Sequence, residues 1–254
     1  MVSETNFTAS TQADWENLYA ERQHLATLMA HDLRSPIDMM FAVGDMLTDS
    51  PSDPGELAEL GDQLKKAAMM QKELIQTYYD YLQLDHETFN NRSLHWLDFQ
   101  NVLQECLSDY QSFSQAKSID IKQTIRTTQA LIQGHPVLLK RLVINLLLNA
   151  IKFSHRGSTI ELTLEQAHEQ FVFRVRDEGI GFPPEKTEEL FEKFSPQRRK
   201  GTSGEHTSGL GLFVSRQIAH WHQGTLTAFS DGPEQGATFT LRMPSAEIKL
   251  DHKA

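Results

Sequence analysis

The chain has few of the features that mark several large classes of protein. Its 254 residues include one cysteine, Cys106, so an internal disulfide is excluded and a reducing compartment is favoured. Apolar runs are short: Leu146–Leu148 is bounded on both sides by asparagine, whereas a membrane-spanning helix needs about 20 apolar residues. The first residues include no apolar stretch of the kind that secretory leaders contain. We therefore expect a cytoplasmic chain that does not insert directly into a membrane.

Basic residues are outnumbered by acidic ones. Lysine and arginine together number 24, aspartate and glutamate number 34, and the net charge is -10. This balance disfavours nucleic acid as a general partner. An anionic ligand such as a nucleotide would need local compensation from Mg²⁺ or from a few basic side chains.

Two long helices are predicted in the first third of the chain. Residues 1–13 are polar and are expected to be flexible, and helical periodicity begins near Asp14, a plausible N-cap. Two prolines and a glycine interrupt the pattern over residues 48–55. A second helix follows, with an apolar seam at three- and four-residue spacing. The seam comprises Leu57, Leu60, Leu64, Ala67, Gln71, Leu74, Tyr78 and Tyr81, of which only Gln71 is polar.

A helical hairpin of this size has too little interior to be stable alone. Pairing two hairpins gives a four-helix bundle, so we expect a homodimer through residues 14–88. The alternative is a hairpin that packs against the remainder of its own chain. Residues 89–93 are expected to be a linker, and residues 246–254 a loose tail.

The pattern changes over residues 94–245, where short strand-like segments alternate with helical ones. This mixture predicts an α/β sandwich, so the fold class of the whole chain is α + α/β. The strands are predicted at 94–97, 118–125, 130–133, 159–166, 170–176, 225–229 and 237–242, and the helices at 98–115, 135–153, 185–193 and 210–222.

One histidine is out of step with the first predicted helix. Met29 and Leu33 follow the apolar period, whereas His31 lies two residues from each and points toward solvent. Asp32 follows it directly, and Pro36 removes a helical N–H just beyond. The sequence thus predicts an exposed imidazole beside a carboxylate, although a histidine on a polar helix face is most often only a solvated side chain.

Asparagines interrupt an apolar helix of the second region. Asn145 and Asn149 lie one turn apart in the helix predicted at 135–153, and Lys152 follows near the same face. An asparagine in such a helix is costly unless its amide has partners. These amides therefore either form hydrogen bonds within the core or provide an oxygen ligand for Mg²⁺, with a lysine beside phosphates.

Two glycine-containing segments follow. Asp177, Gly179 and Gly181 come directly after a predicted strand, and glycine permits close approach of the backbone to a ligand. A carboxylate at a strand end can accept a hydrogen bond from an exocyclic amine such as adenine N6. Gly209-Leu210-Gly211 opens the last predicted helix, where exposed N–H groups suit a phosphate. The loop at 195–208 before it is rich in Lys, Arg, Gly and Ser, and could close over a nucleotide.

The order of these motifs resembles that of the sensor histidine kinases of two-component signalling, over about residues 20–243. Each motif alone is weak, whereas the five together are highly specific. The matching segments are the H box at His31–Pro36, the N box at Asn145–Ser154, the G1 box at Asp177–Gly181, the F box at Leu190–Phe194 and the G2 box at Gly209–Leu212.

The resemblance implies a dimerisation and histidine phosphotransfer domain followed by an ATP-binding domain of the Bergerat type. It also implies an ATP-dependent autokinase in which His31 is the phospho-acceptor and Asp32 its general base. The phosphoryl group would then pass to an aspartate in the receiver domain of a response regulator.

The resemblance further assigns the nucleotide site, with ATP and Mg²⁺ as cofactors. Asn149 is the implied Mg²⁺ ligand, with Asn145 beside it, and Lys152 touches the phosphates. Asp177 reads adenine. The residues that shape the two nucleotide loops are Gly179, Gly181, Gly209, Leu210 and Gly211.

Some positions depart from the family's pattern. Thr207 stands where a leading glycine of the G2 segment is common, and His135 stands where an acidic residue often precedes the proline of the N-box helix. Ser35 replaces the usual Thr or Asn of the phosphatase motif, which bears on dephosphorylation of the regulator. The loop cations at 198–200 leave open which of them contacts a phosphate.

Alternative interpretations stay open on the sequence alone. The chain could be a scaffold that binds a nucleotide without turnover. It could also be another ATPase of the Bergerat fold, such as a chaperone or topoisomerase-type enzyme, although those lack a histidine-bearing hairpin. His24 is a second candidate acceptor, seven residues before His31 and without the acid and the proline. His220 and His222 are predicted to be surface residues.

Overall fold

The computed structural model describes residues 4–49, 53–84, 94–127, 130–167, 170–195, 199–205 and 207–245. The chain divides into two compact units, one ending at Tyr78 and the other beginning at Tyr79. The boundary therefore falls within the second long helix and not at its end. The predicted linker at 89–93 and the predicted tail at 246–254 lie outside the described residues.

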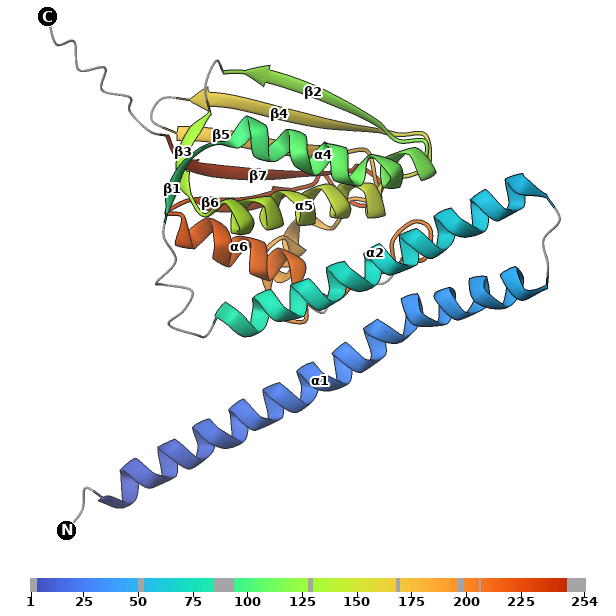
Figure 1. Cartoon of the computed structure of the whole chain (residues 1–254). Coiled ribbons are helices and arrows are strands. Elements are labelled where there is room, and N and C mark those ends of the chain that lie inside the picture. Colours follow the sequence, from blue (N-terminus) through green and yellow to red (C-terminus); the bar gives the residue numbers. More distant parts are fainter. Residues whose placement is uncertain are drawn as a thin grey trace, which may run out of the picture. The chain divides into compact units, whose positions relative to one another are not determined.

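Two long helices dominate the first unit (Figure 1). Helix α1 spans Glu4–Thr48 and helix α2 spans Pro54–Leu84, which confirms the predicted hairpin. The predicted helix start near Asp14 was wrong, because residues 4–13 are helical and contain no proline or glycine that would interrupt α1. None of the described helices is both long and apolar enough to cross a bilayer.

The hairpin buries only part of its apolar seam. Leu60 and Tyr78 are buried, whereas Leu57 and Leu64 of the same seam are exposed. Ile37, which the helical period places on the apolar face of α1, is exposed as well. Two helices cannot enclose residues that lie on the flanks of both apolar faces. The hairpin therefore leaves apolar surface uncovered in a single chain.

A five-stranded sheet forms the centre of the second unit, in the order β2-β4-β5-β7-β6. The pair β2–β4 is parallel and the other neighbours are antiparallel. Two further strands, β1 (His95–Asp98) and β3 (Leu131–Gly134), form a separate antiparallel pair. The strands of the main sheet are β2 (Asp120–Arg126), β4 (Thr159–Ala167), β5 (Gln170–Asp177), β6 (Thr225–Phe229) and β7 (Ala237–Pro244).

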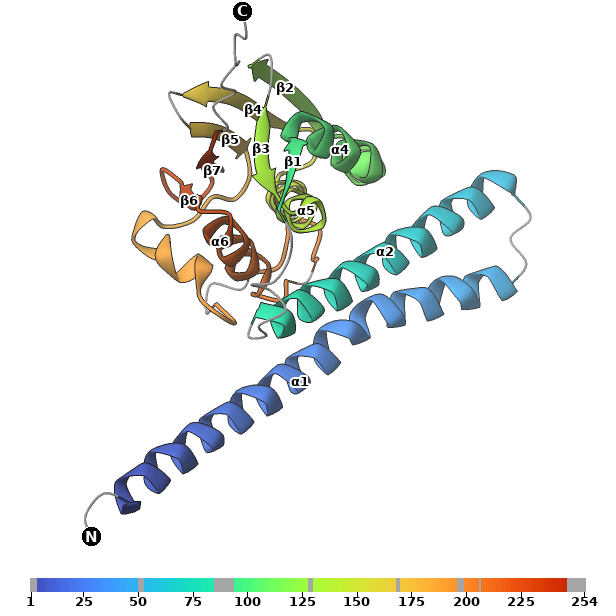
Figure 2. The same cartoon turned by 60° about the vertical axis from the view of Figure 1, so that its left-hand side comes forward.

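Three helices cover one face of this sheet: α4 (Phe99–Ala116), α5 (Pro136–Phe153) and α6 (Gly211–Trp221) (Figures 1 and 2). Leu142 of α5 and Phe173 of β5 are fully buried between the two layers. The predicted α/β sandwich is therefore confirmed.

Local signals account for most helix boundaries. The Asp98 side chain caps α4 by accepting from the Gln100 N–H, and His135 caps α5 ahead of Pro136. The helix predicted at 185–193 is instead two 3₁₀ turns, Pro184–Lys186 and Glu188–Phe191. A segment this short is a marginal α-helix, and 3₁₀ turns are usual in such connectors.

Candidate functional site

Three polar side chains of α5 occupy half-buried positions in an otherwise apolar helix, namely Asn145, Asn149 and Lys152. Asn145 Nδ2 donates a hydrogen bond to Ser215 Oγ on α6, 2.8 Å away. The Asn149 amide forms no hydrogen bond with any residue in the described ranges. Asn145 therefore fits the explanation of hydrogen bonding within the core, whereas the amide oxygen of Asn149 is available to a ligand.

The amide oxygen of Asn149 is a suitable ligand for a magnesium ion that binds together with a nucleotide. Within the described residues, no three His, Cys, Asp or Glu side chains gather as a metal site. An amide oxygen is a hard ligand, and Mg²⁺ commonly takes one or two protein oxygens while phosphates and water complete its coordination. Asn149 could hold the ion in this way.

The start of α6 lies against Asn145. A Cβ atom added to Gly211 would come 2.2 Å from Asn145 Oδ1, so a side chain at this position would displace Asn145. Gly209 has a φ of 70°, and Leu210 at the cap position is fully buried. Leu210 offers no side-chain hydrogen bond to the helix, so the first N–H groups of α6 can bind an anion.

Asp177 lies at the end of β5 and is 4% exposed. Its Oδ1 accepts hydrogen bonds from the Gly179 N–H at 2.9 Å and the Ala237 N–H at 3.2 Å. Burial raises the pKa of this carboxyl from 3.8 to about 6, and the two backbone donors act in the opposite direction. These bonds fix the carboxyl while leaving Oδ2 able to accept from a ligand donor.

The loop after Asp177 packs tightly against its neighbours. A Cβ on Gly179 would lie 2.2 Å from the carbonyl oxygen of Phe153, and a Cβ on Gly181 would lie 2.2 Å from that of Gly232. The Ile180 N–H also donates to the Phe153 carbonyl at 3.1 Å. This contact joins the G1 loop to the end of α5, so the two predicted nucleotide segments meet.

Ser230 supports the G1 loop, and the sequence analysis did not single it out. Its buried hydroxyl accepts from the Phe182 N–H at 3.1 Å and lies 2.6 Å from the Gly236 carbonyl oxygen. It therefore holds the turn after β6 against the G1 loop. The only sequence signal was its place beside a glycine-rich turn. Ser215, the partner of Asn145, was missed as well, although it follows Gly211 by one helical turn.

Arg199 is a cation of the predicted loop that contacts the G1 segment. Its Nη2 donates to the Gly181 carbonyl at 2.6 Å, and its guanidinium lies 5.9 Å from the centre of the Phe153 ring. Burial lowers its pKa from the ordinary value. Lys200 is exposed, and residue 198 lies outside the described residues. Arg199 is thus placed beside the G1 loop.

The first unit contains a second polar cluster, around His31. The His31 side chain is 66% exposed, as the helical period predicts, whereas Asp32 is fully buried. His31 Nδ1 lies 3.1 Å from Asp32 Oδ1, and the Tyr78 hydroxyl donates to Asp32 Oδ2 at 2.8 Å. Tyr78 was missed as a site residue. Its signal was a hydroxyl group in an apolar seam.

Two other histidines differ from expectation. His222 was predicted at the surface but is 4% exposed. Its Nδ1 lies 2.7 Å from the Ile218 carbonyl oxygen, its Nε2 accepts from the His135 N–H at 3.0 Å, and burial lowers its pKa. His135 itself caps α5 in place of the usual acid, while His220 is exposed as predicted.

The chain resembles known proteins over the same two units. Residues 134–247 match the family described as histidine kinase-, DNA gyrase B-, and HSP90-like ATPase. The chain is 26% identical over 238 residues to the sensor histidine kinase RppB of Synechocystis sp., covering 92% of this chain and 51% of RppB. It is 30% identical over 224 residues to the sensor protein KdpD of Escherichia coli, covering 88% of this chain and 24% of KdpD. The chain therefore spans about half or less of these two relatives.

Solved structures share the fold. The histidine kinase AdeS of Acinetobacter baumannii matches 85% of this chain and 98% of its own with a TM-score of 0.56 at 20% identity. The histidine kinase ThkA, solved in complex with the response regulator TrrA, matches 96% of this chain and 68% of its own with a TM-score of 0.60 at 19% identity. The family match and these relatives support a histidine kinase with a Bergerat-type ATPase domain at residues 134–247.

Proposed function

We propose that this chain is an ATP-dependent protein-histidine autokinase that phosphorylates His31. The observation that carries the proposal is the pairing of an exposed His31 imidazole with the buried Asp32 carboxylate, 3.1 Å from Nδ1. A solvated surface histidine would have no need of a buried carboxylate partner, because burying a charge is costly. The motifs of an ATP-binding domain in the same chain would bind ATP, which is the phosphoryl donor.

The proposed step is an in-line phosphoryl transfer. With Nδ1–H donated to Asp32, the neutral imidazole keeps its lone pair on Nε2. This nitrogen attacks the γ-phosphorus of ATP, the bond from that phosphorus to the β,γ-bridging oxygen breaks, and ADP leaves. The Nδ1 proton passes to Asp32 as positive charge develops on the ring. Tyr78 orients the carboxylate and does not touch the reacting atoms.

The nucleotide roles follow the second cluster. Asp177 accepts the adenine N6 amine, Asn149 holds Mg²⁺, and the N-terminal N–H groups of α6 receive phosphate oxygens. Bound Mg²⁺ neutralises the charge of the β- and γ-phosphates. Lys152 lies on the same helix as Asn149 and adds positive charge beside the phosphates.

Partners are part of the same proposal. The uncovered apolar residues of the hairpin, among them Leu57, Leu64 and Phe41, support a homodimer that closes a four-helix bundle. The phosphoryl group on His31 would pass to an aspartate of a response regulator receiver domain. The complex of the related fold ThkA with TrrA supports this assignment.

Incubation with Mg-ATP tests the proposal. We expect phosphate that is acid-labile and alkali-stable, and that is lost in His31→Ala and Asn149→Ala. His24→Ala and Asn101→Ala are matched controls at exposed helical positions and should keep the label. Label that survives in His31→Ala would overturn the acceptor. ATP binding by the wild type without any label would favour a nucleotide-binding scaffold.

A further inference from the structure

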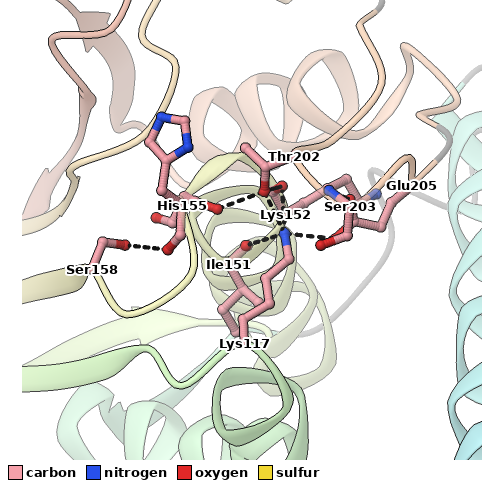
Figure 3. A network of polar contacts seen from close by, with 9 residues as sticks. Lys117, Ile151, Lys152, His155, Ser158, Thr202, Ser203 and Glu205 are labelled. Atoms are coloured by element: carbon pink, nitrogen blue, oxygen red, sulfur yellow. Dashed lines mark hydrogen bonds and ion pairs between the residues drawn. The ribbon is translucent and has the colours of Figure 1, made fainter.

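Lys117 is a nearly buried cation between α4 and β2, and its side chain is 11% exposed. Its ammonium group faces four oxygen atoms from two parts of the second unit (Figure 3). Two are the carbonyl oxygens of Ile151 and Lys152, at 3.0 and 2.8 Å. The other two are Thr202 Oγ1 at 2.8 Å and Glu205 Oε1 at 2.7 Å. The side chain thus links the end of α5 with the loop before α6.

One half of this network stabilises α5. Ile151 and Lys152 belong to its last turn, where carbonyl groups have no partner within the helix. A cation at a helix C-terminus also interacts favourably with the helix dipole. This half accounts for a lysine at position 117, but it does not account for the acidic residue from the loop.

The other half fixes residues 201–205. The Thr202 N–H donates to the Lys152 carbonyl at 3.0 Å, and the Thr202 hydroxyl lies 2.6 Å from the Ser154 carbonyl oxygen. The Gly201 N–H donates to the Glu205 carbonyl at 2.8 Å, which closes a turn. A Cβ on Gly201 would lie 2.6 Å from Lys152 Cγ. The loop therefore lies directly on the residue expected beside the phosphates.

Glu205 makes the loop dependent on Lys117. Its side chain is 20% exposed, so the ion pair is largely shielded from water. Glu205 Oε2 also accepts from the Ser203 N–H at 2.8 Å, which ties the carboxylate to its own turn. Removing either charge leaves the other partly buried without its partner, and this costs more than the loss of a surface pair.

We propose that Lys117 and Glu205 are positioning residues that anchor the loop at 199–205 to the C-terminal end of α5, which keeps the nucleotide site in its binding arrangement. The inference rests on the proposed function, because the loop borders residues assigned there to ATP. Without the anchor, binding must also order the loop. If the loop then adopts the competent arrangement about one tenth of the time, the apparent affinity for ATP falls about tenfold.

The decisive variants separate the two halves of the network. Glu205→Gln and Thr202→Val remove only contacts to the loop, whereas Lys117→Met also removes the contacts to α5. We expect all three to raise KM for ATP about tenfold with little change in kcat, which marks a loss of binding and not of chemistry. Lys117→Met alone should also lower Tm. Lys122→Met, at an exposed lysine, is the control.

Combining the variants tests whether the two residues act together. The double variant Lys117→Met/Glu205→Gln should raise KM no more than the larger single effect, because both remove the same anchor. Effects that multiply would overturn the proposal. So would a Glu205→Gln variant that lowers kcat and leaves KM unchanged.

Amide exchange gives a readout that does not depend on kinase activity. The Gly201 and Thr202 amides donate to the Glu205 and Lys152 carbonyls, so Glu205→Gln should speed their exchange about tenfold while the Gly179 amide is unchanged. Unchanged exchange at Gly201 and Thr202 would overturn the anchor even in an active kinase. Faster exchange in a chain that gives no phosphohistidine would leave the anchor intact and count against the proposed function alone.

Discussion

Tyr78 and Asp32 are 46 residues apart in the sequence, yet the Tyr78 hydroxyl donates to Asp32 Oδ2 at 2.8 Å in the interior of the hairpin. Both residues are fully buried. The other carboxylate oxygen, Oδ1, faces His31 Nδ1 at 3.1 Å. Tyr78 therefore holds the carboxylate in the orientation that directs its second oxygen to the imidazole, which follows the logic of a histidine oriented by a buried acid.

Tyr78→Phe removes this hydroxyl and keeps the ring. We expect autophosphorylation to slow about fivefold, since the loss of one buried hydrogen bond is worth about 1 kcal/mol. The affinity for ATP should not change, because Tyr78 lies in the first unit. The rate of phosphohistidine formation at saturating ATP is the measurement. Tyr79→Phe is the control, because Tyr79 is 53% exposed on the same helix.

A spectroscopic readout separates orientation from stability in that variant. In the wild type we expect His31 Nδ1 to donate to Asp32, 3.1 Å away. This bond would favour the imidazole tautomer with hydrogen on Nδ1, which nitrogen chemical shifts detect. Tyr78→Phe should increase the share of the other tautomer of His31. An unchanged tautomer ratio together with a slow reaction would contradict the positioning role.

The raised pKa of Asp177 predicts that nucleotide binding and the stability of the fold depend on pH in opposite directions. Burial raises its pKa from 3.8 to about 6. Both oxygens of the carboxyl group are free of protons only when it is ionised, and the ionised form accepts from the adenine amine. The affinity for adenine should therefore rise as pH rises through about 6. At a pH between these two pKa values, Asp177 is protonated in the folded protein and ionised in the unfolded chain. The contribution of Asp177 to stability is therefore fully present below 3.8 and is lost as pH rises through about 6.

Titration of adenosine checks this prediction, because adenosine lacks the phosphates of ATP that titrate in the same range. As the pH is lowered through this range, we expect adenosine binding to weaken. The contribution of Asp177 to the free energy of unfolding should increase over the same range. Asp177→Asn should remove the dependence of stability on this group. Adenosine affinity that is flat from about pH 5 to about pH 7 would argue against Asp177 as the adenine acceptor.

Gly211→Ala tests the close approach of α6 to α5. The new Cβ would lie 2.2 Å from Asn145 Oδ1, so Asn145 must rotate and lose its bond to Ser215. We expect a stability loss of about 1–3 kcal/mol by denaturant unfolding and weaker ATP binding. Gly157→Ala is the control, because its φ of 80° strains alanine while no atom lies within 4 Å. It should lose stability and keep ATP binding.

A second substitution distinguishes this clash from a general effect of alanine. Adding Asn145→Ser to Gly211→Ala removes the atom that the new Cβ meets. The double variant should therefore recover part of the stability that Gly211→Ala loses, relative to Asn145→Ser alone. A cost of Gly211→Ala that is the same in both backgrounds would show that Asn145 is not what excludes a side chain there.

Sequence reasoning located the elements whose signals are local. Helix α5 has the predicted N-terminal Pro136 and ends at Phe153 as expected. Its capping residue and its apolar period both depend on residues that are close together in the sequence. The same holds for the Asp98 cap and for the exposure of His31. The G1 and G2 segments were found because glycine at fixed spacing marks close backbone contacts.

Contacts between distant segments could not be predicted in the same way. Tyr78 was assigned to an apolar seam by its period, and only the register of α1 against α2 brings its hydroxyl to Asp32. Ser230 and His222 act through backbone groups of other segments, which leave no periodic signal. The ion pair between Lys117 and Glu205 forms only because the loop at 199–205 packs against the end of α5. Such pairings are set by tertiary structure and not by local propensity.

Cys106 provides a probe of unfolding in the second unit. It is fully buried in α4, and burial raises the pKa of its thiol to about 12. Iodoacetamide reacts with the thiolate, so the folded chain should resist labelling at about pH 8 and become labelled in guanidinium chloride. Stoichiometric labelling of the folded chain would contradict this burial. A ligand that binds only the folded state stabilises it by mass action, so ATP should shift the labelling transition to higher denaturant, and it should shift it less in Glu205→Gln if the anchor supports binding.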